Sequence, residues 1–316
     1  MPFLLAVDSG GTKCEVVLTD ESGHVLGSGR RDQCHRPGER HAGGRGRADG
    51  TVLEAVAEAL ADAPRMDELH WAGRRLSPGL PHSMAAGKVE YHAVREPDGP
   101  MALAGAGAGV LLLAGTGAFA YGRAQDGREL LLDALGPLYG DHGGAYQIGL
   151  AAIRAAGRSN WHPRFSTVLG ECVPDACRAL AGKPVGFNMV GYMLEPRDRS
   201  EIASLAKLVN DAAERGDAIA RDVLMSAAAD GAETVRCVVD RLELSEEELP
   251  LVGAGGVAVN SSLYWETACA RIAEFAPRLR PTVPRQPQVK GLVLAMASEL
   301  GLASPEFRAN LLGSAG

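Results

Sequence analysis

The sequence lacks several features that would assign it quickly to a class. No apolar stretch approaches the ~20 residues needed to cross a bilayer. The six cysteines contain no C-x-x-C pair, and no G-x-x-x-x-G-K-[ST] motif occurs. The opening run Met1–Val7 is too short, and too poor in basic residues, for a secretory signal. We therefore expect a cytoplasmic protein with reduced thiols, and a Walker-type nucleotide site is excluded.

Positive charge is also in deficit. The 316 residues carry 32 Lys and Arg against 39 Asp and Glu, a net charge of -7. This balance argues against nucleic acid or an anionic membrane as a partner. A phosphate ligand stays possible, because backbone amides and a magnesium ion can supply a local positive field. The 40 glycines gather at the ends of apolar runs, where they let a backbone approach a ligand closely.

A strand–turn–strand pattern with a glycine-rich tip occurs twice, at 3–19 and at 110–123. A further strand and then helical segments follow each copy, which predicts a duplicated α/β domain with a nucleotide between the halves. We place the domains at 1–113 and 114–316. The remaining expected strands are 24–28, 129–133 and 249–252, and the expected helices are 51–63 (capped by Thr51), 145–157, 200–216 (capped by Ser200), 217–242, 260–276 (capped by Asn260) and 289–300.

The first glycine tip is Asp8-Ser9-Gly10-Gly11-Thr12-Lys13. An acidic residue ends a buried strand, and a glycine pair then permits a tight turn. Turn amides and the Thr12 hydroxyl suit phosphate oxygens, while the Asp8 carboxylate can hold a hydrated magnesium ion. The same residues also suit a plain β-hairpin turn.

Two further tips follow buried strands. Gly115-Thr116-Gly117 repeats the first tip, and Gly253-Ala254-Gly255-Gly256 leads into a helix. A backbone without side chains at 253–256 suits an adenine and ribose, although an ordinary βα loop has the same composition.

In their order and spacing, the three tips resemble those of the sugar kinase, actin and heat-shock chaperone ATPase superfamily. Within it the chain resembles the N-acetylglucosamine kinase branch, which shares a family with the ATPase activators of benzoyl-CoA reductase. The resemblance covers nearly the whole chain and implies duplicated ribonuclease H-like (actin-like ATPase) α/β domains with a nucleotide cleft between them. It also implies ATP, Mg²⁺ and a sugar substrate, and we further expect a homodimer. The implied ATP contacts are Gly10, Gly11, Thr12, Lys13, Gly115, Thr116, Gly117, Gly255 and Gly256, with Asp8 at the metal.

The resemblance also places the catalytic and substrate residues. The family's N-D-A-x-x-A-L-x-G-A stretch corresponds to 96–106, which puts Asp98 at the general base. Its G-D-E-G-S loop corresponds to 140–144, which puts Asp141 and His142 at the substrate together with Asp98, Thr116 and Gly117. Asp98 also fits a simple Asp-Gly turn, Asp141 a helix N-cap, and His142 a solvated side chain.

The chain departs from the family at several positions. Ala118 and Gly144 stand where serines are usual, and Asp133-Ala134-Leu135-Gly136 replaces G-G-W-G. The family's sugar-binding Asn has no match in 30–50, which offers Gln33, His35 and Arg36.

We expect a kinase that transfers the γ-phosphate of ATP in line to a hydroxyl of an amino sugar of the N-acetylglucosamine type, with Asp98 as general base. One rival is a kinase-like sensor that binds sugar or nucleotide without turnover. The other is an activator ATPase, against which the absence of cysteine between 35 and 171 counts.

Overall fold

The structure is a computed structural model that describes residues 2–10, 13–32, 45–76, 86–182, 187–195 and 197–313. Its internal contacts divide the chain into two compact units. The first runs to Ala106 and includes Arg285 onward, and the second covers Gly107–Pro284.

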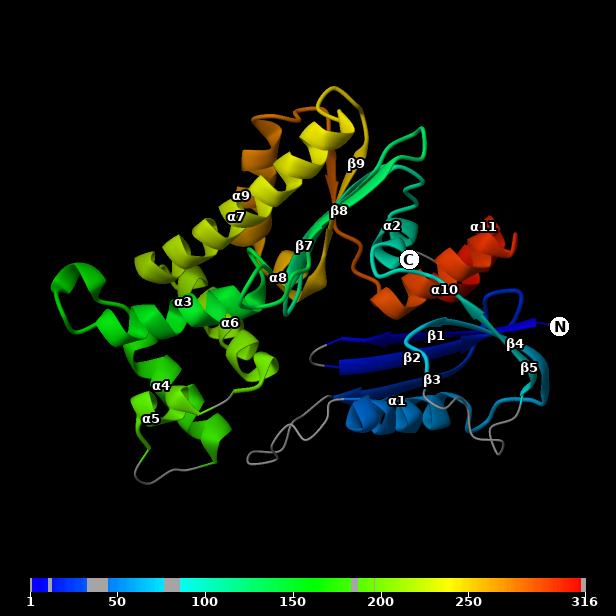
Figure 1. Cartoon of the computed structure of the whole chain (residues 1–316), viewed down its shortest axis with the longest axis horizontal. Coiled ribbons are helices and arrows are strands. Elements are labelled where there is room, and N and C mark those ends of the chain that lie inside the picture. The colour runs from blue at the N-terminus through cyan, green and yellow to red at the C-terminus, as the bar shows by residue number, and fades with distance from the viewer. Residues whose placement is uncertain are drawn as a thin grey trace. The chain divides into compact units, whose positions relative to one another are not determined.

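The first unit is built on a five-stranded sheet of order β3-β2-β1-β4-β5 (Figure 1). Strands β1 (Pro2–Ser9), β2 (Lys13–Thr19) and β3 (Val25–Asp32) form an antiparallel meander. Strands β4 (Met66–Gly73) and β5 (Ala86–His92) continue the sheet in parallel with β1. The expected meander is confirmed, whereas the parallel pair lies in a stretch that the sequence left unassigned.

Helices cover both faces of this sheet because successive residues of β1 point to opposite sides. Leu5 and Val7 pack with α1 (Arg45–Ala59). Leu4 and Ala6 pack with α10 (Gln288–Glu299) on the other face (Figure 1). Two shorter helices, α2 (Asp98–Leu103) and α11 (Pro305–Leu312), complete the unit.

The second unit repeats this arrangement with a sheet of order β10-β9-β6-β7-β8. Strands β6 (Gly109–Ala114), β7 (Ala118–Arg123) and β8 (Glu129–Asp133) form the meander. Strands β9 (Pro250–Ala254) and β10 (Arg280–Thr282) extend it in parallel with β6. The two sheets have the same strand order, so the expected duplication and fold class are confirmed.

The second unit also contains a series of helices. They are α3 (Ala145–Arg158), the 3-10 helix η2 (Pro163–Phe165), α4 (Leu169–Ala181), α5 (Met189–Leu194), α6 (Arg199–Glu214), α7 (Ala218–Leu242), α8 (Gly255–Asn260) and α9 (Ser262–Ala273). Helix α7 packs directly on the sheet, because a Cβ at Gly122 of β7 would lie within 2.7 Å of Val238 and Leu242.

The division into units differs from the expected domains in two respects. The chain passes between units after Ala106 rather than after residue 113, and the segment from Arg285 onward belongs to the first unit. The physical reason is hydrophobic: Val293 and Met296 of α10 are buried in one cluster with Leu4 of β1.

Three expected helix caps are wrong. Helix α1 begins at Arg45, so Thr51 lies inside it. Asp198, not Ser200, caps α6 by accepting from the Ser200 amide. Ser261, not Asn260, caps α9, because the Ser261 hydroxyl accepts from the Tyr264 amide. Asp198 and Ser261 both have an extended backbone, which lets their side chains accept from the first turn.

Two general expectations can also be compared with the structure. The five described cysteines are all free thiols. Within the described ranges, no helix combines the length and the apolar character that crossing a bilayer requires.

Gly149 provides a test of the packing between α3 and α6. A Cβ at this position would lie 2.0 Å from the carbonyl oxygen of Ile202, so the helices would have to separate. We expect Gly149→Ala to lower the free energy of unfolding by about 1–3 kcal/mol in urea titrations. Gly157→Ala, on the same helix but with open space around it, should instead raise it by up to about 1 kcal/mol. Equal effects of both substitutions would contradict this packing.

Candidate active site

The Gly115-Thr116-Gly117 tip of the second unit is held by the first turn of α3. The Gly115 amide donates to the Gly117 carbonyl over 2.9 Å, which closes the turn. The Ala145 amide donates to the Gly115 carbonyl (2.8 Å), and the Tyr146 amide donates to the Thr116 carbonyl (3.1 Å). The tip is therefore fixed to a helix N-terminus, whose amides favour negative charge nearby.

Asp141 lies directly against this tip. Its side chain is 5% exposed and forms a 2.6 Å ion pair with Nη2 of Arg199, at the start of α6. A Cβ at Gly117 would lie 2.6–2.8 Å from the carboxyl atoms of Asp141, so only glycine fits there. The structure thus brings the expected phosphate tip and the expected substrate carboxylate together. Arg199 was not among the site residues expected from the sequence.

Asp133, at the end of β8, holds the loop that carries Asp141 and His142. Its buried carboxylate accepts from the amides of Asp141 (2.6 Å) and His142 (2.8 Å), and Nδ1 of His142 lies 2.9 Å away. Burial acts most strongly and opposes ionisation, but these hydrogen bonds together lower the pKa of Asp133. The loop is therefore built around an ionised carboxylate, and Asp141 itself has a left-handed φ of 60°.

Asp133 is a positioning residue that sequence reasoning noticed only as a departure from the family. The signal that could have identified it is an acidic residue closing a strand eight positions before Asp141. Gly140 supports this interpretation, because a Cβ there would lie 2.2 Å from Oδ1 of Asp133.

The third glycine tip contacts the second. Gly255 has a φ of +85°, and a Cβ there would lie 2.4 Å from the carbonyl of Ala114 and 2.6 Å from the Gly115 amide nitrogen. Gly253 has a different reason to be glycine, since a Cβ would meet the Trp265 ring at 2.8 Å. Around Gly256 a Cβ would meet nothing closer than Asn260 Nδ2 at 4.0 Å, so this is the most open glycine of the tip.

In the first unit, Asp8 is the penultimate residue of β1, next to the first tip. Burial raises the pKa of Asp8, and the charge of Lys13 partly offsets the rise. The Lys13 ammonium pairs with Glu15 at 2.6 Å. The Gly10 amide donates to the Lys13 carbonyl (3.0 Å), and space is open around Gly10. The expected ATP contacts Gly11 and Thr12 lie outside the described residues, as do Gln33, His35 and Arg36.

Asp98 begins α2 in the first unit. Its side chain is 16% exposed. Oδ2 accepts from the Arg95 amide (2.9 Å) and Nε (3.2 Å), and Oδ1 accepts from Arg95 Nη2 (3.2 Å). The C-terminal helices hold α2 in place. A Cβ at Gly291 of α10 would lie 2.3 Å from the Gly99 carbonyl oxygen, and Arg308 of α11 donates to the Ala102 carbonyl (2.8 Å).

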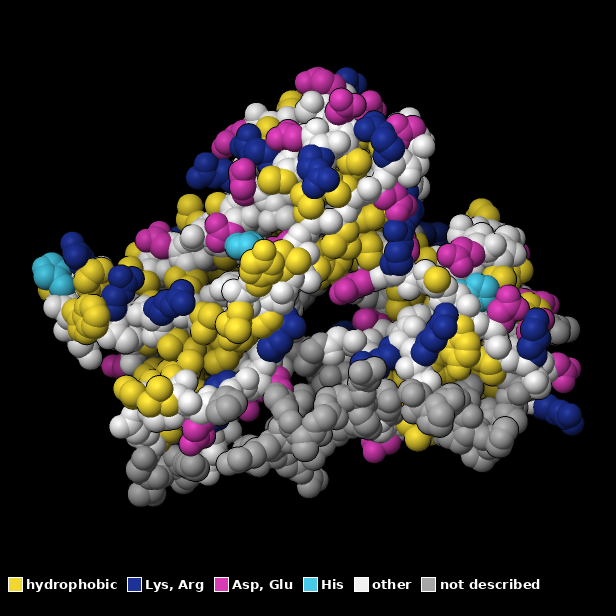
Figure 2. Space-filling view, in the orientation of Figure 1, with side chains coloured by type: hydrophobic (Ala, Val, Ile, Leu, Met, Phe, Trp, Pro, Cys, Tyr) yellow, Lys and Arg dark blue, Asp and Glu magenta, His cyan; other side chains and the backbone are white. Residues whose placement is uncertain are grey.

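The charges on the face shown in Figure 2 are mixed. Acidic and basic side chains alternate over each unit, without a broad basic area among the coloured residues. This distribution accompanies the net charge of -7.

Comparison with known proteins identifies relatives over most of the chain. The sequence profile of the BadF/BadG/BcrA/BcrD ATPase family matches residues 5–295. The chain is 28% identical over 192 residues to an N-acetylmuramic acid/N-acetylglucosamine kinase of Clostridium acetobutylicum (60% of this chain, 61% of the relative). It is 26% identical over 172 residues to an N-acetyl-D-glucosamine kinase of Dictyostelium discoideum (54% and 53%). The chain thus spans less than two thirds of each of these kinases.

A solved structure extends the match to almost the whole fold. A Chromobacterium violaceum protein proposed to be an N-acetylglucosamine kinase superposes with a TM-score of 0.65 at 19% identity, over 93% of this chain and 98% of that one. At this identity the match establishes the fold alone, which is that of the actin-like ATPases.

Asp133→Asn tests how the 140–144 loop is held. Loss of the charged acceptor should lower the free energy of unfolding by about 1–3 kcal/mol at pH 7. Because the folded-state pKa of Asp133 lies below the ordinary 3.8, this contribution is complete above about pH 4 and disappears as the pH falls through the folded-state pKa. In urea titrations from pH 3 to 7, the free energies of unfolding of the two proteins should therefore become more similar as the pH falls. Asp126→Asn, in the exposed β7–β8 turn, is the control and should have little effect. If the free energies of unfolding of the native protein and Asp133→Asn differ by the same amount at all pH values, the role of the Asp133 charge is contradicted.

Proposed function

Since the chain belongs to the BadF/BadG/BcrA/BcrD ATPase family, we propose that it is an ATP-dependent kinase that phosphorylates an amino sugar of the N-acetylglucosamine type. One observation carries the proposal. In the second unit, Gly117 lies against Asp141 and Gly255 lies against Ala114 and Gly115, so the expected phosphate, substrate and adenosine segments are neighbours. Two distant relatives that are kinases of such sugars support the choice of acceptor.

The proposed reaction is an in-line transfer. A sugar hydroxyl oxygen attacks the γ-phosphorus, the bond between this phosphorus and the β–γ bridging oxygen breaks, and ADP leaves. The Asp98 carboxylate accepts the hydroxyl proton. Arg95 orients this carboxylate by donating to both of its oxygens.

Asp8 fits the magnesium ion that such a reaction uses. Its carboxylate lies near the end of β1, and burial raises its pKa, so a neighbouring cation would offset the cost of the charge. Lys13 does not fill this place in the structure, since its ammonium pairs with Glu15. When bound with ATP, magnesium would neutralise phosphate charge.

The substrate end of the site uses Asp141 and His142. The Asp141 carboxylate, held by Arg199, is a fixed acceptor for sugar hydroxyls. The ring of His142 is anchored at Nδ1 by Asp133 but is 59% exposed, so it offers a second polar contact. Homodimer formation stays a prediction.

Two departures from the family have packing explanations. Gly144 cannot be serine without moving the tip, because a Cβ there would lie 2.7 Å from the carbonyl carbon of Gly117. Ala118 is 2% exposed, so a serine hydroxyl at that position would be buried. Neither change by itself argues against turnover.

A sensor without turnover is the second candidate. The observation that favours it is the engagement of both Asp98 oxygens by Arg95, which competes with proton transfer. Turnover and binding must therefore be measured separately.

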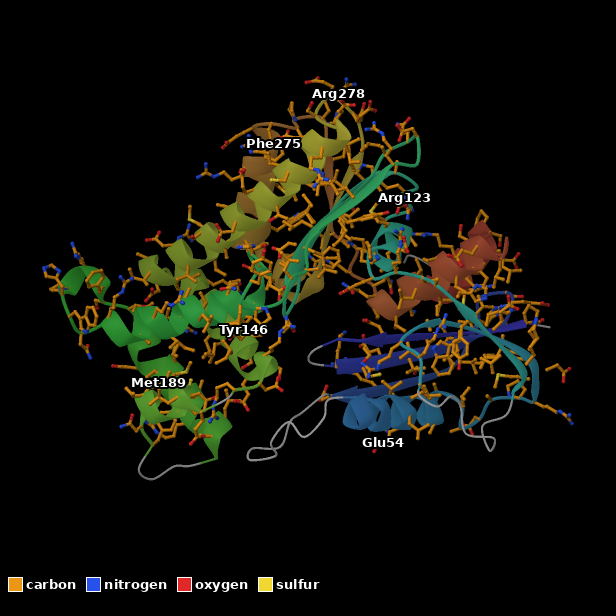
Figure 3. The ribbon with its side chains drawn as sticks, in the orientation of Figure 1. Glu54, Arg123, Tyr146, Met189, Phe275 and Arg278 are labelled. Carbon is orange, nitrogen blue, oxygen red and sulfur yellow. The ribbon has the colours of Figure 1, made fainter. Side chains whose placement is uncertain are left out.

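Asp98→Asn tests the catalytic proposal. Removing the proton acceptor should lower kcat by roughly 10²–10⁴-fold with little change in nucleotide affinity. A coupled ADP-release assay over a panel of amino sugars measures kcat, and calorimetry with a non-hydrolysable ATP analogue measures binding. Glu54→Gln, on the exposed face of α1 (Figure 3), is the control and should behave like the native protein. If no sugar gives turnover above that of Asp98→Asn while nucleotide still binds, the kinase proposal fails and the sensor remains.

Gly117→Ala tests the tip. The added methyl group would overlap the Asp141 carboxylate, displacing either the phosphate turn or the substrate acceptor. We expect kcat/KM to fall by about 100-fold or more, since misplacement of about 1 Å can cost that much. Gly107→Ala, just before β6 with no atom within 4 Å of its Cβ position, should retain full activity. Equal activity of the two variants would show that the tip lies outside the reacting site.

A further inference from the structure

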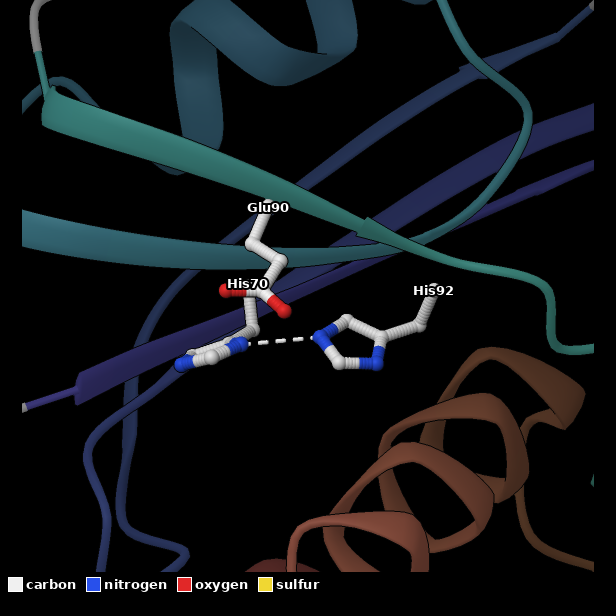
Figure 4. A group of neighbouring side chains, drawn as sticks. All are labelled: His70, Glu90 and His92. Carbon is white, nitrogen blue, oxygen red and sulfur yellow. Dashed lines mark hydrogen bonds between the residues drawn. The ribbon is translucent and has the colours of Figure 1, made fainter.

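A cluster of two histidines and a glutamate lies in the first unit and plays no part in the proposed reaction. His70 is on β4, and Glu90 and His92 are on β5. His70 stands opposite Glu90 in the parallel register, and His92 follows Glu90 by two residues, so all three point to the same face of the sheet (Figure 4).

The three side chains direct ligand atoms toward one point. His70 Nδ1 and His92 Nε2 are 2.8 Å apart, and one ligand atom from each of the three residues lies within 4.8 Å of the others (Figure 4). Two nitrogens bound at ~2.0 Å to a tetrahedral ion lie roughly 3.3 Å apart. The imidazoles would therefore need to separate by only about half an ångström to accept an ion.

The surroundings also orient the His92 imidazole for metal binding. The other ring nitrogen of His92, Nδ1, lies 3.5 Å from Oε2 of Glu299 at the end of α10. A carboxylate on the distal nitrogen is the usual outer partner of a metal-bound histidine.

Lys88 is the competitor for this position. Its ammonium lies 3.0 Å from Glu90 and 2.9 Å from Glu68, and it is 64% exposed. Glu90 can exchange this exposed contact for a metal ion at little cost.

We propose that His70, His92 and Glu90 bind a divalent transition-metal ion of the zinc type. Two nitrogens and one carboxylate oxygen suit zinc, cobalt or nickel better than magnesium or calcium, which prefer oxygen ligands alone. The ion joins β5, an edge strand, to β4. It is separate from the phosphate-binding tip, because His70 pairs with Leu4 and Asp8 lies four residues further along β1, roughly 13 Å away along the strand.

Zinc titration of the full chain, first stripped with a chelator, tests the site. Calorimetry should show one tight zinc per chain, and zinc at roughly 100 times Kd should raise Tm by about 5 °C. Cobalt should give the visible absorption bands of a four-coordinate site. His92→Gln should weaken zinc binding by more than about 100-fold, and Glu299→Gln by about 10-fold.

Two further variants separate metal binding from structural support. Lys88→Gln removes the competing ammonium, so it should tighten zinc binding, which a purely structural role of the cluster would not cause. His24→Gln, an exposed histidine next to Asp20 in the same unit, should leave the affinity unchanged. If His92→Gln does not fold, the Lys88→Gln titration and an anomalous zinc peak between the two imidazoles in crystals decide the matter. Undiminished zinc binding in His70→Gln/His92→Gln, or an anomalous peak elsewhere only, would overturn the proposal.

Discussion

The second unit depends on glycines at positions where atoms of another loop lie too close to leave room for a Cβ atom. Gly117 admits the Asp141 carboxylate, Gly144 admits the Gly117 backbone, and Gly255 admits the carbonyl of Ala114. These approaches are closer than any side chain permits, so three loops separated in sequence become one rigid surface. The Gly115 and Thr116 carbonyls are bound by α3, which fixes that surface to a helix start.

The parts of the fold that depend on local sequence could be predicted. Apolar runs joined by glycine turns predicted both meanders, because antiparallel neighbours need only a short turn. The pair β4 and β5 escaped detection, since Met66–Gly73 contains acidic residues and the buried His70 instead of a continuous apolar run. The assignment of α10 to the first unit could not be predicted either, because it depends on packing with Leu4 of β1 and not on any local pattern.

The candidate site divides in the same way. Asp141 and the glycine tips could be predicted as site residues because a motif specifies them residue by residue, and the structure brings those of the second unit into contact. Arg199 could not be identified, since its partner Asp141 is 58 residues away and a lone arginine at a helix start has no distinguishing pattern. The role of Asp133 in holding the 140–144 loop could not be predicted, because the left-handed backbone at Asp133, Ala134 and Asp141 is evident only in the structure.

The attachment of α2 by the C-terminal helices has a consequence for biosynthesis. Arg308 donates to a carbonyl 206 residues earlier, and Gly291 packs on Gly99. Among the described residues, the second unit is the single segment Gly107–Pro284, whereas the first combines residues up to Ala106 with residues from Arg285 onward. During synthesis the segment Gly107–Pro284 can therefore fold before α10 and α11 of the first unit have been made. The helix that carries Asp98 gains these contacts only after α10 and α11 have been synthesised.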